Sequence, residues 1–316
     1  MRMKKITGLA AVISTVIVAS AANAEEVASE LSDWTLVWSD EFDGDALDLD
    51  KWEYEVDCWG GGNEERQCYT ARPENVSVAD GVLSLTARQE WMRGSALPEH
   101  LRKTPEDEAK LAVQPFSSGR IVTKGKADWL YGRFEVRAKL PRGQGLWPAI
   151  WMLPTDESYG AWAASGEIDI VEAVNLGAQC NKCPNNEENR IYGTLHFGGE
   201  WPENTYKGKE TGLPEPADDF HIFAVEWREG EIVWFVDGKE YHRLTSRDWR
   251  SSTSAGRKRE HAPFDHPFYM IFNVAVGGHL ADGKNEGGIS LDGFPKSMLV
   301  DWVRVYQHSA DAASAN

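Results

Sequence analysis

The stretch Glu167-Ile168-Asp169-Ile170-Val171-Glu172 places three carboxylates within six residues of a segment that otherwise has the composition of a buried strand. Because alternate residues of a strand share a face, Glu167 and Asp169 are expected to point one way and the two isoleucines the other. Glu172 has the wrong parity for the acidic face unless one extra residue near positions 170–171 forms a bulge. The stretch therefore predicts a bulged β-strand with three acids on one face.

An acidic strand face of this kind has two interpretations. Most acid-rich strands are solvated faces with apolar residues behind them, so the motif alone does not establish catalysis. However, like charges on one strand face repel one another, which favours a site that uses them. With the bulge, the long side chains of Glu167 and Glu172 can approach the separation of about 5–5.5 Å that is typical of a retaining glycosidase.

The first 24 residues predict export. Three basic residues, an apolar stretch at 6–22 and the cleavage signal Ala22-Asn23-Ala24 make residues 1–24 a signal peptide, with a membrane anchor as the less favoured alternative. Its removal takes three positive charges and no acid away, so the net charge goes from −17 to −20. We therefore expect a secreted or periplasmic protein with a single domain at 25–308 and a disordered tail at 309–316.

Composition limits the partners. An acidic surface repels nucleic acid and anionic membranes, so we expect neither as a partner of this protein, which we take to be a monomer. The chain contains 14 tryptophans, which serve either as core residues or as flat platforms for sugar rings.

Four cysteines remain after the predicted cleavage, at Cys58, Cys68, Cys180 and Cys183. In an exported protein they predict disulfides, and of the three possible pairings we expect the local one, Cys58–Cys68 with Cys180–Cys183. Structural zinc is the alternative for the Cys180-x-x-Cys183 pair, although no second pair of this kind accompanies it.

Strand patterns dominate after the signal segment, and no long helical pattern appears. The expected strands are 82–87, 119–123, 132–139, 191–197, 222–228, 231–236 and 300–306. Turn signals at Glu229-Gly230 and Asp237-Gly238 make 220–243 an antiparallel meander. Residues 91–113 and 246–263 are expected to be irregular insertions. Many short strands with Gly and Pro turns predict an all-β sandwich or barrel.

Several blocks in order resemble glycoside hydrolase family 16, within it the bacterial laminarinase-like endo-β-1,3-glucanases, from about Trp34 to Gln307. They are 37–42 (VWSDEF), 62–70 (GNEERQCYT), 145–154 (GLWPAIWMLP), 165–172 (SGEIDIVE), 194–199 (TLHFGG), 273–278 (NVAVGG), 294–295 (FP) and 300–306 (VDWVRVY). This resemblance implies a β-jelly-roll of two curved antiparallel sheets with a substrate cleft on the concave face.

The resemblance also implies catalytic roles. Glu167 would be the nucleophile and Glu172 the acid/base, while Asp169 would hydrogen-bond Glu167 and modulate both pKa values. His196, in the H-F-G-G block, would lie beside the acid/base and the sugar. No organic cofactor or catalytic metal is implied.

Further residues are implied to contact the substrate. Trp147 and Trp151 are four apart on a strand, hence on one face, and resemble a sugar-stacking pair, although either would also suit the core. The proposed hydroxyl contacts at the donor subsites are Asn63, Arg120, Trp162 and Asn273. Arg120 is equally suited to a structural ion pair.

A structural calcium ion is implied at Glu41, Asp301 and the carbonyl of Gly81, with ordinary surface acids as the alternative. The expected activity is hydrolysis of internal β-1,3-glucosidic bonds in laminarin-type glucans, with mixed-linkage β-1,3-1,4-glucan as a second substrate. An agarase- or carrageenase-like galactanase and a non-catalytic glucan-binding protein are the alternatives. The Gly60-Gly61-Gly62 run and Cys68 depart from the family pattern and put the substrate in doubt more than the reaction.

Overall fold

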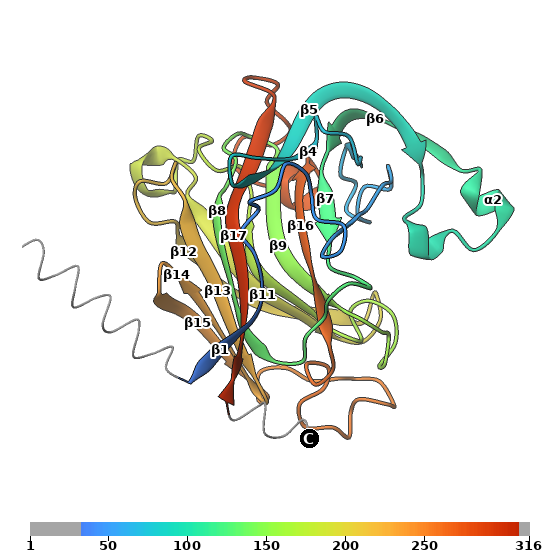
Figure 1. Cartoon of the computed structure of the whole chain (residues 1–316), viewed down its shortest axis with the longest axis vertical. Helices are drawn as coiled ribbons and strands as arrows, with labels where there is room; N and C mark the ends of the chain where they lie inside the picture. Colours follow the sequence, from blue (N-terminus) through green and yellow to red (C-terminus); the bar gives the residue numbers. More distant parts are fainter. Residues whose placement is uncertain (1–32, 310–316) are drawn as a thin grey trace, which may run out of the picture.

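The computed structural model describes residues 33–309 and consists almost entirely of β-strands arranged in two sheets (Figure 1). One hydrophobic core joins the two sheets, which confirms the predicted jelly-roll class. The predicted signal peptide and, apart from Ser309, the predicted tail lie outside the described residues. Within residues 33–309, no helix has the length and apolar character needed to cross a bilayer.

The first sheet has seven antiparallel strands and carries the acidic motif. Its strands, in spatial order, are β12 (Asn204–Gly212), β11 (Arg190–Gly198), β10 (Glu167–Ala173), β9 (Leu146–Pro154), β16 (Phe268–Val276), β7 (Arg120–Val122) and β2 (Glu53–Tyr54). The strand β10 therefore has β9, β16 and β7 on one side and β11 and β12 on the other.

The second sheet has ten strands. In spatial order they are β15 (Lys239–Thr245), β14 (Glu231–Val236), β13 (His221–Arg228), β8 (Gly132–Lys139), β17 (Lys296–His308), β5 (Val82–Ser95), β6 (Leu111–Ser118) and β3 (Gln67–Tyr69), while β1 (Trp34–Asp40) pairs with β17 and β4 (Val76–Ala79) with β5. All pairs are antiparallel except β3 with β6. The meander predicted at 220–243 is formed by β13, β14 and β15.

Helical segments among residues 33–309 are single short turns. They are η1 (Glu99–Leu101), α2 (Pro105–Glu108), η2 (Pro184–Asn186) and α3 (His279–Asp282). Thr104 caps α2, since its side chain accepts a hydrogen bond from the amide of Asp107, and Pro105 occupies the first helical position.

The core fixes the orientation of β10. Ile168, Ile170 and Val171 are buried in the cluster between the sheets, where burial of each such side chain contributes about 1.5–3 kcal/mol. Beneath the acidic face, the indole Nε1 of Trp234 on β14 donates a 2.8 Å hydrogen bond to the carbonyl oxygen of Asp169. The second sheet thus holds the backbone of the acidic strand from behind.

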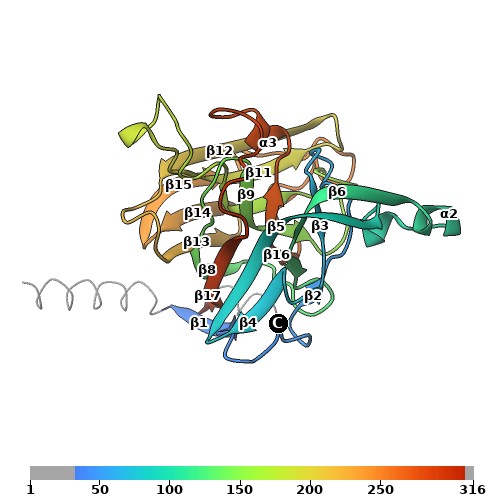
Figure 2. The same ribbon diagram turned by 90° about the horizontal axis from the view of Figure 1, so that it is seen from above.

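The prediction of an irregular insertion at 91–113 is wrong at both ends. Strand β5 continues to Ser95 and β6 begins at Leu111, and the two pair antiparallel through positions such as Arg93 and Val113. With α2 near its tip, this arm (residues 88–117) projects from the body in both views (Figures 1 and 2). The arm exposes apolar residues, among them Trp91, so its sequence lacks the alternation that signals a half-buried strand.

The edge strand β12 was not predicted from the sequence. Its polar sequence NTYKGKETG is mostly exposed, so no apolar period marks it. Residues 246–263 form no named strand, as predicted, and only Ser251 makes an isolated bridge, to Gly198.

Candidate active site

The bulge in β10 is present at Ile170. Asp169 pairs with Trp151 of β9 and Val171 with Ile150, which leaves Ile170 as the extra residue. On the other side, Glu167, Asp169 and Glu172 pair with residues 196, 194 and 192 of β11, which all share one face. The bulge therefore brings the three carboxylates to the same side of the sheet, as the sequence predicts.

Each glutamate is held by an indole from a different segment. Trp162, in the loop before β10, donates a 2.6 Å hydrogen bond from Nε1 to Oε2 of Glu167. Trp147 of β9 donates a 2.9 Å hydrogen bond from Nε1 to Oε1 of Glu172. These bonds restrict the rotamers of both carboxyl groups, and preorganisation of this kind is what catalysis requires.

His196 lies between two acids. Its Nε2 is 3.3 Å from Oδ2 of Asp169 and 3.7 Å from Oε1 of Glu167. A cation between two carboxylates reduces their repulsion, and the predicted hydrogen bond from Asp169 to Glu167 stays a prediction. The three side chains present ligand atoms within 4.8 Å of one another, a spacing that a metal ion can also bridge.

Burial and mutual repulsion set the protonation of this cluster. Asp169 is only 1% exposed, and burial, together with Glu172 and Glu167, raises its pKa well above the usual value. Burial also raises the pKa of Glu172, against the opposing effects of His196 and the Trp147 hydrogen bond. Burial alone would lower the pKa of His196, but Glu167 and Asp169 raise it to about 10. The raised pKa of His196 favours its charged form, and the raised pKa of Glu172 makes this carboxyl a weaker acid than a free glutamate.

Beyond β9, a chain of hydrogen bonds crosses the same side of the sheet. Trp151 Nε1 donates to Asn273 Oδ1 (2.7 Å), and Asn273 Nδ2 donates to the phenol of Tyr69 (3.1 Å). The Tyr69 hydroxyl lies 3.4 Å from Oε2 of Glu65, whose Oε1 accepts from Asn63 Nδ2 (3.1 Å). This amide network unites three predicted substrate residues, Trp151, Asn273 and Asn63.

Sequence reasoning missed the two connecting members of the amide network. Tyr69 and Glu65 are buried, and both stand in the 62–70 block that carries the resemblance. Their spacing of four residues gives no sign that they join Asn63 to Asn273, because Tyr69 lies on β3 and Asn273 on β16. Only the packing of these two distant strands shows the connection.

Arg120 forms the structural ion pair that was one of its two predicted roles, while its contact with a substrate hydroxyl stays a prediction. Its Nε is 2.6 Å from Oε2 of Glu55, so the ion pair is formed. Its guanidinium also lies over the ring of Trp151, 5.1 Å from the centroid, beside its strand partner Asn273. It therefore packs against one of the predicted stacking indoles.

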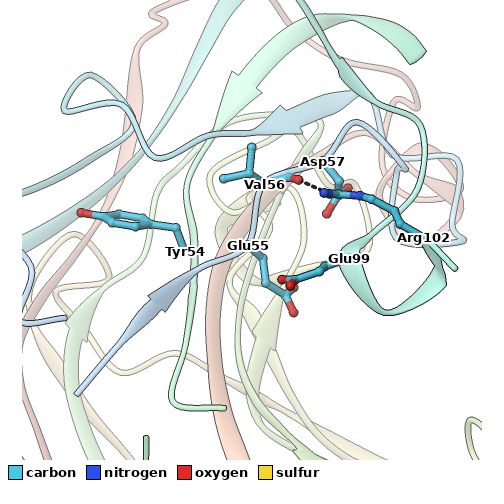
Figure 3. A pocket seen from close by; sticks show the side chains of 6 residues that line it. All are labelled: Tyr54, Glu55, Val56, Asp57, Glu99 and Arg102. Atoms are coloured by element: carbon cyan, nitrogen blue, oxygen red, sulfur yellow. Dashed lines mark hydrogen bonds between the residues drawn. The ribbon is translucent and has the colours of Figure 1, made fainter. Parts of the chain in front are cut away.

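A small pocket lies next to Glu55, at the far edge of this sheet (Figure 3). It is lined by Tyr54, Glu55, Val56, Asp57, Glu99 and Arg102. Arg102 donates a 2.7 Å hydrogen bond to the carbonyl oxygen of Val56, which ties the arm to the strand edge. The arm thus reaches the edge of the predicted substrate face.

Trp162 is placed apart from the other proposed donor contacts. Its ring lies 5.7 Å from that of His196 on β11, whereas Asn63, Arg120 and Asn273 belong to the opposite side of β10. Trp147 and Trp151 of β9 are both half-buried. They lie on the same side of the sheet as the three acids. Both indoles keep part of their surface exposed, although Trp151 also packs against Val122, Tyr269 and Ile271, and sugar stacking by the pair stays a prediction.

The predicted calcium residues face arginines in this structure. Both carboxylate oxygens of Glu41 accept from Arg304, at 3.0 and 2.8 Å, and Asp301 pairs with Arg137. Because guanidinium groups already stand beside both acids, this donor set is not arranged to receive an ion. Calcium binding with the carbonyl of Gly81 would require these arginines to move, and it stays a prediction.

Both predicted disulfides form. Cys58 is bonded to Cys68 and Cys180 to Cys183, which is the local pairing expected from the sequence. The first bond joins the segment after β2 to β3, next to Tyr69, and so braces the end of the amide network.

Comparison with known proteins identifies the family. Residues 34–308 match the family model described as the beta-porphyranase A–D domain of glycoside hydrolase family 16. The chain is 42% identical to glucan endo-1,3-beta-glucosidase A1 of Niallia circulans, over 86% of this chain and 38% of that protein. It is 38% identical to the beta-glucanase of Rhodothermus marinus over 97% of each protein.

Solved structures agree with this comparison. The X-ray structure of the laminarinase from Rhodothermus marinus has 40% sequence identity and a TM-score of 0.68, with 87% of this chain and 98% of that chain covered. A further relative by sequence, a beta-1,3-glucan-binding protein of Penaeus monodon, is 32% identical over 77% of this chain and 74% of that protein. The family match and the paired glutamates on β10 lead to the same conclusion: the chain belongs to glycoside hydrolase family 16.

Proposed function

We propose that this protein is a retaining endo-glycosidase that hydrolyses internal β-1,3-glucosidic bonds of laminarin-type glucans, with mixed-linkage β-1,3-1,4-glucan as a second substrate. The observation that carries the proposal is the bulge at Ile170, which sets Glu167 and Glu172 on one side of the sheet, each held by an indole. The relatives named as glucan endo-1,3-beta-glucosidases and laminarinase support the choice of glucan.

In the first step, the Glu167 carboxylate attacks the anomeric carbon while the glycosidic carbon–oxygen bond breaks. Glu172 donates its proton to the departing oxygen, for which its raised pKa suits it. A covalent glycosyl-enzyme results.

In the second step, Glu172 removes a proton from water, the water oxygen bonds to the anomeric carbon, and Glu167 is released. The anomeric configuration is retained because it inverts twice. Charged His196 stabilises Glu167 when it leaves as a carboxylate, at the 3.7 Å separation seen here.

The second candidate is a galactanase, because the family model that matches this chain is described as the beta-porphyranase A–D domain. Reducing-sugar release on laminarin, barley mixed-linkage glucan, carboxymethylcellulose, agarose and porphyran, side by side, decides between them. Release from laminarin with retained configuration in proton NMR supports the proposal. Release from agarose or porphyran alone keeps the two glutamates and overturns the glucan assignment.

A glucan-binding protein without activity is a further alternative, because one relative has that name. The variants Glu167→Ala and Glu172→Ala distinguish the two: an enzyme loses hydrolysis and still binds laminarin, whereas a binding protein is unaffected by either change. Unchanged hydrolysis in Glu167→Ala would show that the nucleophile is assigned to the wrong residue.

We also propose export and cleavage after Ala24, which rests on the sequence of residues 1–24 alone. Sequencing the N-terminus of the protein recovered from medium and periplasm tests this, with Glu25 as the expected first residue. Gel filtration of the same material tests the expected monomer.

A further inference from the structure

An exposed aromatic ring lies beside the catalytic cluster on its β12 side. Tyr206 of β12 is the strand partner of His196, so both side chains lie on the same side of the sheet as Glu167. The ring centroids of Tyr206 and His196 are 5.7 Å apart, at an angle of 36°. Nevertheless 70% of Tyr206 is exposed. Tyr206 thus presents an exposed aromatic surface next to the acids, and the sequence predicts no function for it.

The strand around Tyr206 leaves this ring open. Its neighbours on the same face of β12 are Asn204 and Gly208. A Cβ at Gly208 would lie 2.6 Å from Oγ1 of Thr194, so any side chain there would collide with β11. The position next to Tyr206 therefore stays bare, and one side of the ring is free for a ligand.

The position of Tyr206 relative to the scissile bond follows from the sheet order. Three of the four predicted donor contacts, Asn63, Arg120 and Asn273, lie on the β9, β16 and β7 side of the glutamates, whereas the fourth, Trp162, contacts His196 and Glu167. Tyr206 lies on the opposite side, beyond β11. A glucan that crosses the strands and is cut at Glu167 and Glu172 places its leaving-group sugar there.

We propose that Tyr206 is the stacking platform of the leaving-group subsite, where it holds the departing glucosyl unit and then any sugar that enters as an acceptor. The axial C–H groups of a β-glucosyl ring pack on an aromatic face, and a saccharide held there competes with water for the glycosyl-enzyme. Tyr206 thus sets the partition between transglycosylation and hydrolysis. This inference rests on the proposed function.

The alternative role for Tyr206 is purely structural, since Trp162 and Tyr206 both contact the ring of His196. Loss of that support would change the rate with every substrate and leave the partition ratio unchanged. The partition ratio is therefore the measurement that separates the two roles.

The test uses an aryl β-laminaribioside as donor, with and without laminaribiose as acceptor, and measures transfer products against hydrolysis products. The ratio is set after the aryl group has left, so it reports on the acceptor subsite alone. We expect Tyr206→Ala to lower the ratio roughly three- to tenfold, and Tyr206→Phe to keep it near the wild-type value. Trp91→Ala, which removes a similarly exposed indole (76%) from the arm, is the matched control.

An unchanged ratio in Tyr206→Ala overturns the inference and leaves the proposed function intact. A ratio that falls equally in Trp91→Ala also overturns it, because the effect would not belong to this subsite. Wild-type protein that cleaves neither laminarin nor the aryl donor refutes the proposed function and the inference with it.

Discussion

On the β9 side of the glutamates, indole, amide and phenol groups are joined in one hydrogen-bonded chain, whereas on the β12 side an aromatic ring stands exposed beside a glycine. Trp151, Asn273 and Tyr69 satisfy one another's polar atoms and are partly or fully buried. Tyr206 is 70% exposed. The polar groups of the first side are fixed by one another, so a ligand that bound there would lose little entropy through side-chain ordering. The second side suits exchange, since a leaving group must depart and water must enter.

The largest effect is expected at the boundary between the two sides. Glu172→Gln keeps an acceptor for the Trp147 hydrogen bond but removes the transferable proton, so kcat on laminarin should fall by roughly 10²- to 10⁴-fold. Thermal unfolding of the variant checks that the fold is intact. A kcat within tenfold of wild type would assign the acid/base role to another group.

The β9 side should be the more sensitive to loss of a single polar group. Asn273→Ala leaves Trp151 Nε1 without its acceptor and Tyr69 without its donor, which should lower the free energy of unfolding by about 1–3 kcal/mol. Tyr206→Ala, on the open side, should change it by less than about 0.5 kcal/mol. Urea unfolding of both variants measures the difference, and equal losses would contradict the contrast between the two sides.

The pH profile tests the electrostatic link across β10. Because Glu172 must be protonated for the first step, activity is lost as pH rises through its pKa. His196 lowers that pKa, so His196→Asn should raise it and move the basic limb of kcat/KM to higher pH, whatever the drop in absolute rate. Trp147→Phe removes a weaker effect of the same sign. A basic limb that moves to lower pH in His196→Asn would refute this arrangement of charges.

The smallest effect is expected far from the glutamates. Trp91→Ala, which removes an exposed side chain of the arm, should leave kcat/KM for laminarin unchanged and alter the free energy of unfolding by no more than about 0.5 kcal/mol. Steady-state kinetics with laminarin would reveal a marked rise in KM if the arm bound the polysaccharide, and such a rise would extend the substrate face beyond the sheet.

Some regions of the molecule were predictable from the sequence and others were not, for a physical reason. Glu167, Asp169 and Glu172 are neighbours in sequence, so strand alternation and one bulge were enough to place them together. The disulfides were likewise predictable, because Cys58–Cys68 and Cys180–Cys183 each close a short loop. The arm was not, because its strands expose apolar residues and carry no regular period.

Local sequence patterns are enough to predict the acidic strand, its bulge, the all-β class and the local disulfides, since each depends on residues close together in the chain. The folded protein alone shows that Tyr69 and Glu65 join Asn63 to Asn273, that Arg120 lies over Trp151, and that Tyr206 lies beside His196. These contacts arise between strands distant in sequence. Their partners are fixed by sheet order and register, which the shared core imposes and no local pattern encodes.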